Sequence, residues 1–142
     1  NEFYQIYFQY HFFKLLKKNN FTIALKPHPG CDLNINNIYF PEFTQDLGRF
    51  ESIYYDYDII IFDYANTSCL TQSLKSNKPI VVLDHGKIQL YKNIKSELEK
   101  RVEFLKFKKN KFLLPNLDEK QILKSIHRSI NKTRNYRDFS FL

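Results

Sequence analysis

The chain has 142 residues, 43% of them hydrophobic and 26% charged, with a formal net charge of +7. This length allows one domain with a real core, and the 14 Phe and 10 Tyr, beside only 3 Gly and 5 Pro, exclude a disordered chain. No apolar run reaches the roughly 18 residues of a membrane span, and the N-terminal residues, which mix aromatic and polar side chains, are not expected to form a signal peptide. Cys31 and Cys69 are too few for a disulfide scaffold or a zinc site, so we expect reduced thiols in a cytoplasmic protein.

Charge is divided unevenly along the sequence. Residues 1–86 hold seven Lys/Arg and nine Asp/Glu, a net charge of −2, whereas residues 87–142 hold fifteen and six, a net charge of +9. The basic part is interpreted in three ways: a solvated helical surface, a site for an anionic ligand, or a patch for anionic lipid or nucleic acid.

The first predicted element is a helix that begins near Tyr4, because apolar residues recur at close to helical spacing. Lys17 and Lys18 suit the C-terminal end of a helix, and Asn19-Asn20 can end it. Residues 21–26 then have the pattern of a strand, which Pro27 stops. The following segment is rich in loops, with a short strand expected at 38–40 and a short helix near 43–50.

The strongest predicted strand covers residues 58–63, a continuous apolar run typical of a central parallel strand. A tight turn at 64–66 follows, and Thr67 or Ser68 can cap a helix that ends before Pro79. Residues 80–83 form a second buried strand. Strand, turn, helix and strand in this order predict a βαβ unit.

The C-terminal part is predicted to be mostly helical. A Lys/Glu-rich helix is expected over 87–100, and residues 102–107 either continue it or form a short strand. Asp118 is the expected N-cap of a final helix with an apolar stripe. The alternation predicts an α/β fold with a Rossmann-like parallel sheet flanked by helices, in which residues 1–131 form the domain and 132–142 a tail.

Polar clusters follow three of the predicted strands, where ligands bind in open α/β sheets. The clusters are Lys26-Pro27-His28-Pro29-Gly30, then Asp63-Tyr64-Ala65-Asn66-Thr67-Ser68, then Asp84-His85-Gly86. If the strands are parallel neighbours, all three clusters line one edge of the sheet. The sequence contains no Walker-type loop, dinucleotide glycine pattern or metal-ligand spacing.

Each candidate residue has both a functional and a structural interpretation. Thr67 and Ser68 can bind phosphate at a helix N-terminus or act as an ordinary N-cap. His28, fixed between two prolines, can bind phosphate, act as a general acid/base, or be structural. Lys26 can neutralise the same phosphate or extend into solvent. Asp63 can position a ligand or cap the following turn, and Asp84 also has the pattern of turn chemistry.

Taken together, the clusters resemble the C-terminal, donor-binding half of GT-B transferases that build bacterial surface polymers. The matching segments are residues 26–30, 58–68 and 77–84. The closest family is the CDP-glycerol glycerophosphotransferases of teichoic acid synthesis, with capsule Kdo transferases as relatives. The Asp63-Tyr64 pair and a hydroxyl pair match that family's second motif, while Gln72 stands where the family often has Asp or Glu.

The resemblance implies one half of a GT-B fold whose N-terminal, acceptor-binding domain is missing from these residues. It implies that Thr67 and Ser68, with the adjacent Asn66 and with Lys26, bind donor phosphates, and that His28 is the catalytic residue. Asp63 and Asp84 would position the donor, a CDP-, CMP- or UDP-linked substrate. No metal and no resident cofactor is expected.

Two alternative functions remain open at this point. A nucleotide-sugar epimerase of the same fold would need a pair of carboxylates near the anomeric phosphate. A non-catalytic module would use the basic part on anionic membrane or nucleic acid, with Tyr91, Phe104, Phe107 and Phe112 as stacking residues. The transferase is the leading hypothesis. Such an enzyme is expected to be cytoplasmic, with peripheral contact to the anionic inner face of the membrane, and to bind no nucleic acid.

Overall fold

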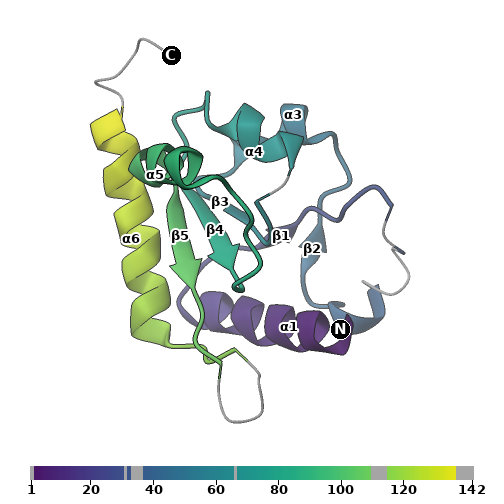
Figure 1. Ribbon diagram of the computed structural model, residues 1–142. Coiled ribbons are helices and arrows are strands. Elements are labelled where there is room, and N and C mark those ends of the chain that lie inside the picture. Colours follow the sequence, from purple (N-terminus) through teal and green to yellow (C-terminus); the bar gives the residue numbers. More distant parts are fainter. Residues whose placement is uncertain (1, 31, 33–36, 66, 110–114, 137–142) are drawn as a thin grey trace.

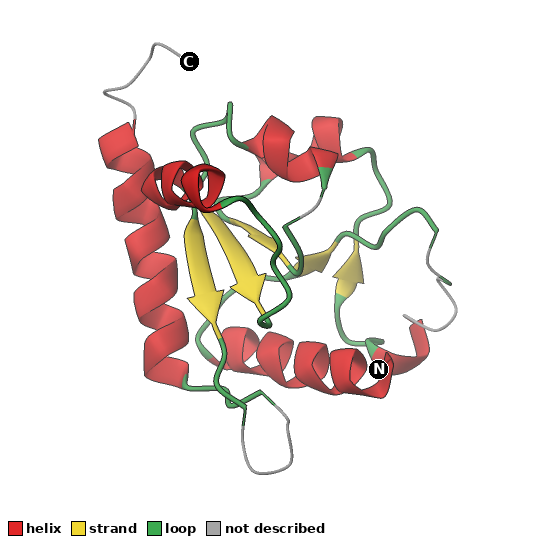
Figure 2. Ribbon diagram, viewed as in Figure 1, coloured by secondary structure: helices red, strands yellow, loops and turns green. Residues whose placement is uncertain are grey.

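The computed structural model describes residues 2–30, 32, 37–65, 67–109 and 115–136. Helices and strands alternate along most of this length, which confirms the α/β class (Figures 1 and 2). The elements are α1 (Glu2–Lys18), β1 (Ala24–Leu25), β2 (Thr44–Gln45), α3 (Phe50–Ile53), η1 (Tyr54–Asp56), β3 (Ile60–Phe62), α4 (Ser68–Ser73), β4 (Ile80–Asp84), α5 (Lys92–Arg101), β5 (Glu103–Lys106) and α6 (Glu119–Tyr136).

The central sheet has the strand order β3-β4-β5, and all of its strands are parallel. Ile60 pairs with Ile80, and Val81 pairs with Glu103, so the carboxyl ends of the strands lie at one edge. A second, two-stranded parallel sheet pairs β1 with β2. Parallel strands linked by helices are the predicted Rossmann-like arrangement.

Helices cover both faces of the central sheet, because its strands are apolar on both sides. Side chains of α1 and α6 pack on one face, in a cluster that includes Phe8, Phe12, Val81 and Ile126. Side chains of η1 and α4 pack on the other face. Figure 1 shows α1 across the bottom, near the arrowheads of β4 and β5, with α3 and α4 at the opposite end.

Successive side chains of a strand point to opposite faces of the sheet, so one run of apolar residues can pack into a hydrophobic cluster on each face. In β4, Val81 and Leu83 join the cluster with α1, whereas Ile80 and Val82 join the cluster with α4. The whole of β4 is buried. This burial on both faces is what the unbroken apolar run at 80–83 predicted.

The ends of the long helices are determined by local chemistry. Asn20 has a φ of 66°, the left-handed conformation that ends a helix, and it follows α1 as predicted. At the start of α6, the Asp118 carboxylate accepts a hydrogen bond from the Gln121 backbone N–H at 3.1 Å. Asp118 is therefore the N-cap that the sequence indicated.

The segment from 37 to 53 differs from the expectation. Residues 37–39 are helical where a strand was expected, and β2 lies within the segment that was expected to be a helix. The helix α3 begins only at Phe50. Pairing with β1 stabilises a strand as short as β2, and such a tertiary contact leaves no period in the sequence.

The expected boundary after residue 131 falls inside a helix. Helix α6 continues to Tyr136, and Thr133 is buried. The Thr133 hydroxyl oxygen accepts a hydrogen bond from the Arg101 guanidinium at 3.0 Å, so this last part of the helix packs against the domain. Among the described residues, no helix is long and apolar enough to cross a membrane.

Candidate functional site

The structure brings the clusters after β3 and β4 together. Asp63 follows β3 and His85 follows β4, and the Asp63 Oδ1 and His85 Nε2 atoms are 3.0 Å apart. Both side chains are mostly buried, with 22% of Asp63 and 16% of His85 exposed. The contact arises because β3 and β4 are parallel neighbours, so residues that follow them meet at the same edge.

Helix α1 closes over this edge and engages the second oxygen of Asp63. The Gln9 side-chain amide donates to Asp63 Oδ2 at 2.8 Å, and the Gln5 amide donates to the same atom at 3.1 Å. Both carboxylate oxygens of Asp63 therefore have partners within the chain. Asp63 holds α1 to the end of β3, a role that the sequence analysis did not assign to it.

The His85 ring lies among aromatic side chains. Its centroid is 4.6 Å from that of Phe8 and 5.5 Å from that of Phe107. Its Nδ1 atom is buried and has no hydrogen-bond partner among the described residues. The arrangement favours the tautomer in which Nε2 carries the hydrogen and donates to Asp63, because an N–H at Nδ1 would be buried without an acceptor.

Thr67 caps the helix that follows β3. Its Oγ1 atom accepts a hydrogen bond from the backbone N–H of Cys69 at 3.2 Å, so the N-cap interpretation of this residue is confirmed. Ser68 is the first residue of α4, and its side chain is exposed. Asn66, the third expected phosphate ligand in this cluster, lies outside the described residues.

Asp84 ends β4 and forms the turn that follows. Its Oδ1 atom accepts a hydrogen bond from the Gly86 backbone N–H at 2.8 Å, and its Oδ2 atom is 3.7 Å from Lys95 Nζ. Gly86 has a φ of 78°, which favours glycine. The turn chemistry predicted for this cluster is therefore present, and only 6% of Asp84 is exposed.

Lys26 and His28 follow β1, which belongs to the second sheet. His28 Nδ1 accepts a hydrogen bond from the Gly30 backbone N–H at 3.0 Å, and Lys26 Nζ lies 3.4 Å from the carbonyl oxygen of Pro27. Both side chains are exposed. Within the described part of the chain their hydrogen bonds are thus local, and none joins them to Asp63.

A further pair of polar residues near Lys26 was not expected from the sequence. Asp46 follows β2 and accepts a hydrogen bond from the Tyr57 hydroxyl at 2.6 Å. The hydrogen bond from Tyr57 lowers the pKa of Asp46, as do the Gly48 backbone N–H and the charge of Lys26. The same bond raises the pKa of Tyr57 to about 12. Because β2 itself was not predicted, no sequence signal placed Asp46 at a strand end.

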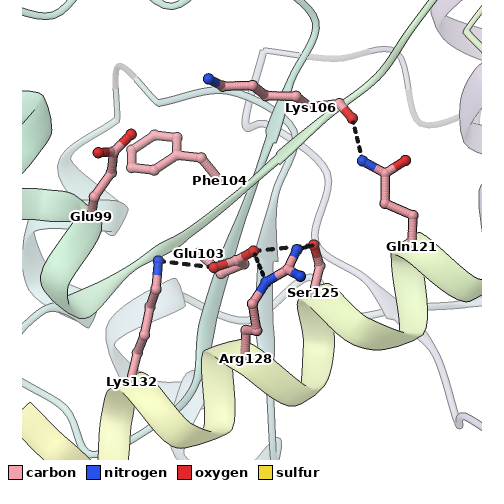
Figure 3. A pocket seen from close by; sticks show the side chains of 8 residues that line it. All are labelled: Glu99, Glu103, Phe104, Lys106, Gln121, Ser125, Arg128 and Lys132. Carbon is pink, nitrogen blue, oxygen red and sulfur yellow. Dashed lines mark hydrogen bonds and ion pairs between the residues drawn. The ribbon is translucent and has the colours of Figure 1, made fainter.

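Two hollows lie on other parts of the surface than the contact between Asp63 and His85. One, of about 360 Å³, lies between β5 and α6 beside the buried carboxylate of Glu103 (Figure 3). The other, of about 510 Å³, lies between α3, η1 and the end of α4. Neither hollow is lined by an expected site residue.

Several cations of the basic part have partners within the domain. Arg128 Nε and Lys132 Nζ each lie 2.8 Å from an oxygen of Glu103, as Figure 3 shows. Of the aromatic residues considered for nucleic-acid stacking, Phe104 and Phe107 pack against the two core clusters. Tyr91 is 80% exposed, and Phe112 lies outside the described residues.

The fold is that of a Rossmann-like α/β domain. Polar residues gather at the carboxyl edge of its central parallel sheet, where the strands end. Comparisons of the chain with protein-family models, with curated proteins and with solved structures returned no match.

Proposed function

We propose that this chain is the donor-binding half of a transferase, which moves a sugar or polyol phosphate from a nucleotide-activated donor in surface-polymer synthesis. The observation that carries the proposal is the meeting of the β3 and β4 ends, where Asp63 and His85 are 3.0 Å apart. In open α/β sheets the carboxyl edge of parallel strands is where ligands bind. The resemblance of the motifs to donor-binding domains supplies the substrate class.

In this proposal three exposed side chains touch the donor, together with the partly buried Thr67 and with Asn66. His28, Lys26 and Ser68 are exposed and extend from strand ends or from the first turn of α4. Lys26 and the hydroxyl groups of Thr67 and Ser68, with Asn66, would bind the donor phosphates. His28 would donate a proton or a hydrogen bond to the departing phosphate, whose negative charge such donors stabilise.

Asp63 and Asp84 take an indirect part in the proposal. Their oxygens already have partners in α1, in the turn at Gly86 and in Lys95, so they would position the donor by holding the loops around it. No metal or resident cofactor forms part of the proposal. The acceptor would bind to an N-terminal domain outside these residues. The basic part, residues 87–142, would contact the anionic face of the membrane that borders the cytoplasm.

Nucleotide binding tests the proposal. We expect CDP, CMP or UDP to shift backbone amide resonances of Lys26, His28 and Gly30 and of residues 67–70 in a titration followed by NMR. His28→Ala should weaken binding about tenfold, the loss of one charge-assisted hydrogen bond, and Ser68→Ala should weaken it by a smaller factor.

Exposed residues of the same type supply the matched controls. His127→Ala and Ser52→Ala change an exposed histidine on α6 and an exposed serine on α3, and both should bind as the parent chain does. Absence of binding by all three nucleotides, or shifts confined to other surfaces, would contradict the proposal.

The partners of the carboxylates also bear on the epimerase alternative. An epimerase would need two carboxylates that face the anomeric phosphate, but the oxygens of Asp63 and Asp84 have partners within the chain. Asp63 and Asp84 are therefore poor candidates for the pair of carboxylates that an epimerase needs. Comparing transfer to an acceptor with interconversion of sugar nucleotides separates the two activities.

A further inference from the structure

The hollow of about 510 Å³ lies at the amino end of β4, away from the edge where Asp63 and His85 meet. Its volume is within the range of about 300–1,000 Å³ that is typical of sites for small ligands. Figure 1 shows α3 and α4, which border it, at the end of the molecule opposite to α1. The residues of its lining that carry the inference are Glu51, Tyr54, Tyr55, Gln72, Lys75 and Asn77.

One side of the hollow is a column of aromatic rings. The Phe50 and Tyr54 rings are stacked, with centroids 5.3 Å apart and planes 18° apart. The Tyr55 ring lies against that of Tyr54, with its centroid 3.9 Å away and its plane tilted by 31°. Tyr54 and Tyr55 line the hollow, and Phe50 packs behind them. Tyr55 is 63% exposed, so a large aromatic surface at the hollow is left in contact with water.

The rest of the lining is polar and carries no net charge. Gln72 extends from α4, and Lys75 and Asn77 follow that helix in the chain. Glu51 of α3 supplies one negative charge, which balances the positive charge of Lys75. Amide side chains both donate and accept hydrogen bonds, which suits hydroxyl groups.

The two sides are fixed relative to each other. Lys78 Nζ donates to the carbonyl oxygen of Tyr55 at 3.0 Å, which joins the aromatic column to the segment before β4. That segment is in turn held by Arg101, whose Nη2 atom donates to the carbonyl oxygens of Ser76 and Lys78 at 2.8 and 2.7 Å.

Arg101 is only 3% exposed, and the partners described for its guanidinium are carbonyl and hydroxyl oxygens. Burying a guanidinium is costly, and here it serves to order this segment. A hollow whose backbone is already ordered loses less conformational entropy when it binds a ligand.

We propose that this hollow binds a neutral saccharide. One face of a pyranose ring consists of C–H groups and packs on an aromatic ring such as that of Tyr55, while its equatorial hydroxyls reach the Gln72 and Asn77 amides. Glu51 and Lys75 carry opposite charges, so the lining has no excess of positive charge that would select a phosphate group. The inference rests on this hollow alone and stands whether or not a nucleotide binds at the other edge.

Saturation-transfer NMR with neutral disaccharides tests the inference, with maltose, cellobiose and di-N-acetylchitobiose as probes. We expect transfer to pyranose C–H protons for at least one probe at millimolar concentration, together with amide shifts at 51–55 and 72–77. Tyr55→Ala should weaken binding about tenfold or more, because it removes the stacking surface. Tyr55→Phe should retain binding, because it keeps the ring.

Tyr91→Ala is the matched control, since Tyr91 is an exposed tyrosine on a different part of the surface. It should bind the disaccharides as the parent chain does. Adenosine serves as a second, flat ligand. Binding of adenosine without any disaccharide would overturn the proposal, as would equal losses in Tyr55→Ala and Tyr91→Ala or the absence of binding by every disaccharide.

Discussion

The carboxylate of Glu103 shows how a single residue organises the basic part of the chain. Only 6% of its side chain is exposed, and it faces α6 from β5. Arg128 and Lys132 bind its two oxygens at 2.8 Å, and the Ser125 hydroxyl donates to it at 3.2 Å. Two cations of a region with a net charge of +9 are thus used to neutralise one buried acid.

Replacing Glu103 tests whether this cluster is structural. In Glu103→Gln, Arg128 and Lys132 lose the charge that they neutralise, and we expect the free energy of unfolding to fall by about 1–3 kcal/mol. Glu97→Gln is the control, because Glu97 pairs with Lys100 on the surface and its side chain is 71% exposed. That change should cost less than about 0.5 kcal/mol. Urea denaturation measures both values, and equal effects would contradict the interpretation.

The contribution of Glu103 should also depend on pH. Burial alone raises the pKa of Glu103, but the hydrogen bonds from Lys132 and Arg128 outweigh it and hold the pKa below its ordinary value. A carboxyl whose pKa is lowered on folding adds stability above its unfolded pKa of about 4.3 and loses it as the pH falls through the folded value. The difference in unfolding free energy between the parent and Glu103→Gln should therefore shrink between pH 5 and more acidic conditions.

At the scale of elements, α4 depends on its cap because it is short. It has only 6 residues, and the Thr67 hydroxyl oxygen accepts the hydrogen bond that would otherwise leave the Cys69 N–H unpaired. Short helices gain little from propensity, so local capping and packing against β3 and β4 determine where this one begins.

Removing the cap should destabilise the domain by a predictable amount. We expect Thr67→Ala to lower the free energy of unfolding by about 1 kcal/mol, and Thr67→Ser to retain most of it, because serine keeps the hydroxyl. Ser68→Ala should have little effect, since the exposed Ser68 is not the cap. Thermal and urea unfolding give the comparison, and a larger loss in Ser68→Ala than in Thr67→Ala would reassign the cap.

The helices and strands differ in how clearly the sequence predicts them. β4 is an unbroken apolar run bounded by Pro79 and the Asp84 turn, so its residues were predicted almost completely. β2 contains only Thr44 and Gln45 and is stabilised by parallel pairing with β1. A strand that is half exposed and two residues long carries no periodic signal, and the sequence therefore favoured a helix there.

At the scale of the whole molecule, α1 is an integral part of the domain. Phe8, Phe12 and Leu16 of α1 are buried against Val81 and Leu105 of the sheet. The same helix reaches the strand ends through Gln5 and Gln9, which bind Asp63. One helix thus completes a core and also closes the edge between β3 and β4.

Two phenylalanines of α1 give a matched test of this arrangement. Phe8 is 1% exposed and Phe3 is 68% exposed, so only the former can leave a cavity. We expect Phe8→Ala to lower the free energy of unfolding by about 3–5 kcal/mol and Phe3→Ala to change it by less than about 0.5 kcal/mol. Chemical denaturation measures both, and a small loss in Phe8→Ala would show that α1 docks loosely.

Two structural features at the candidate site followed from the sequence, because they are local. The cap at Thr67 and the turn at Asp84 depend on hydrogen bonds between residues two positions apart, which residue type and spacing predict. The engagement of Asp63 by Gln9 joins residues 54 positions apart. No pattern in one sequence encodes such a contact, so the part that α1 plays at this edge was missed.

The sequence by itself determined the α/β class, the parallel strands at 60–62 and 80–84, a cap at Thr67 or Ser68 and the N-cap Asp118, because periodicity and capping act over a few residues. Tertiary structure alone decided that Asp63 and His85 meet under α1, that Lys132 and Arg128 neutralise Glu103, and that Tyr55 borders an open hollow. These features depend on which surfaces pack together, and the free energy of packing belongs to pairs of elements that are distant in the chain.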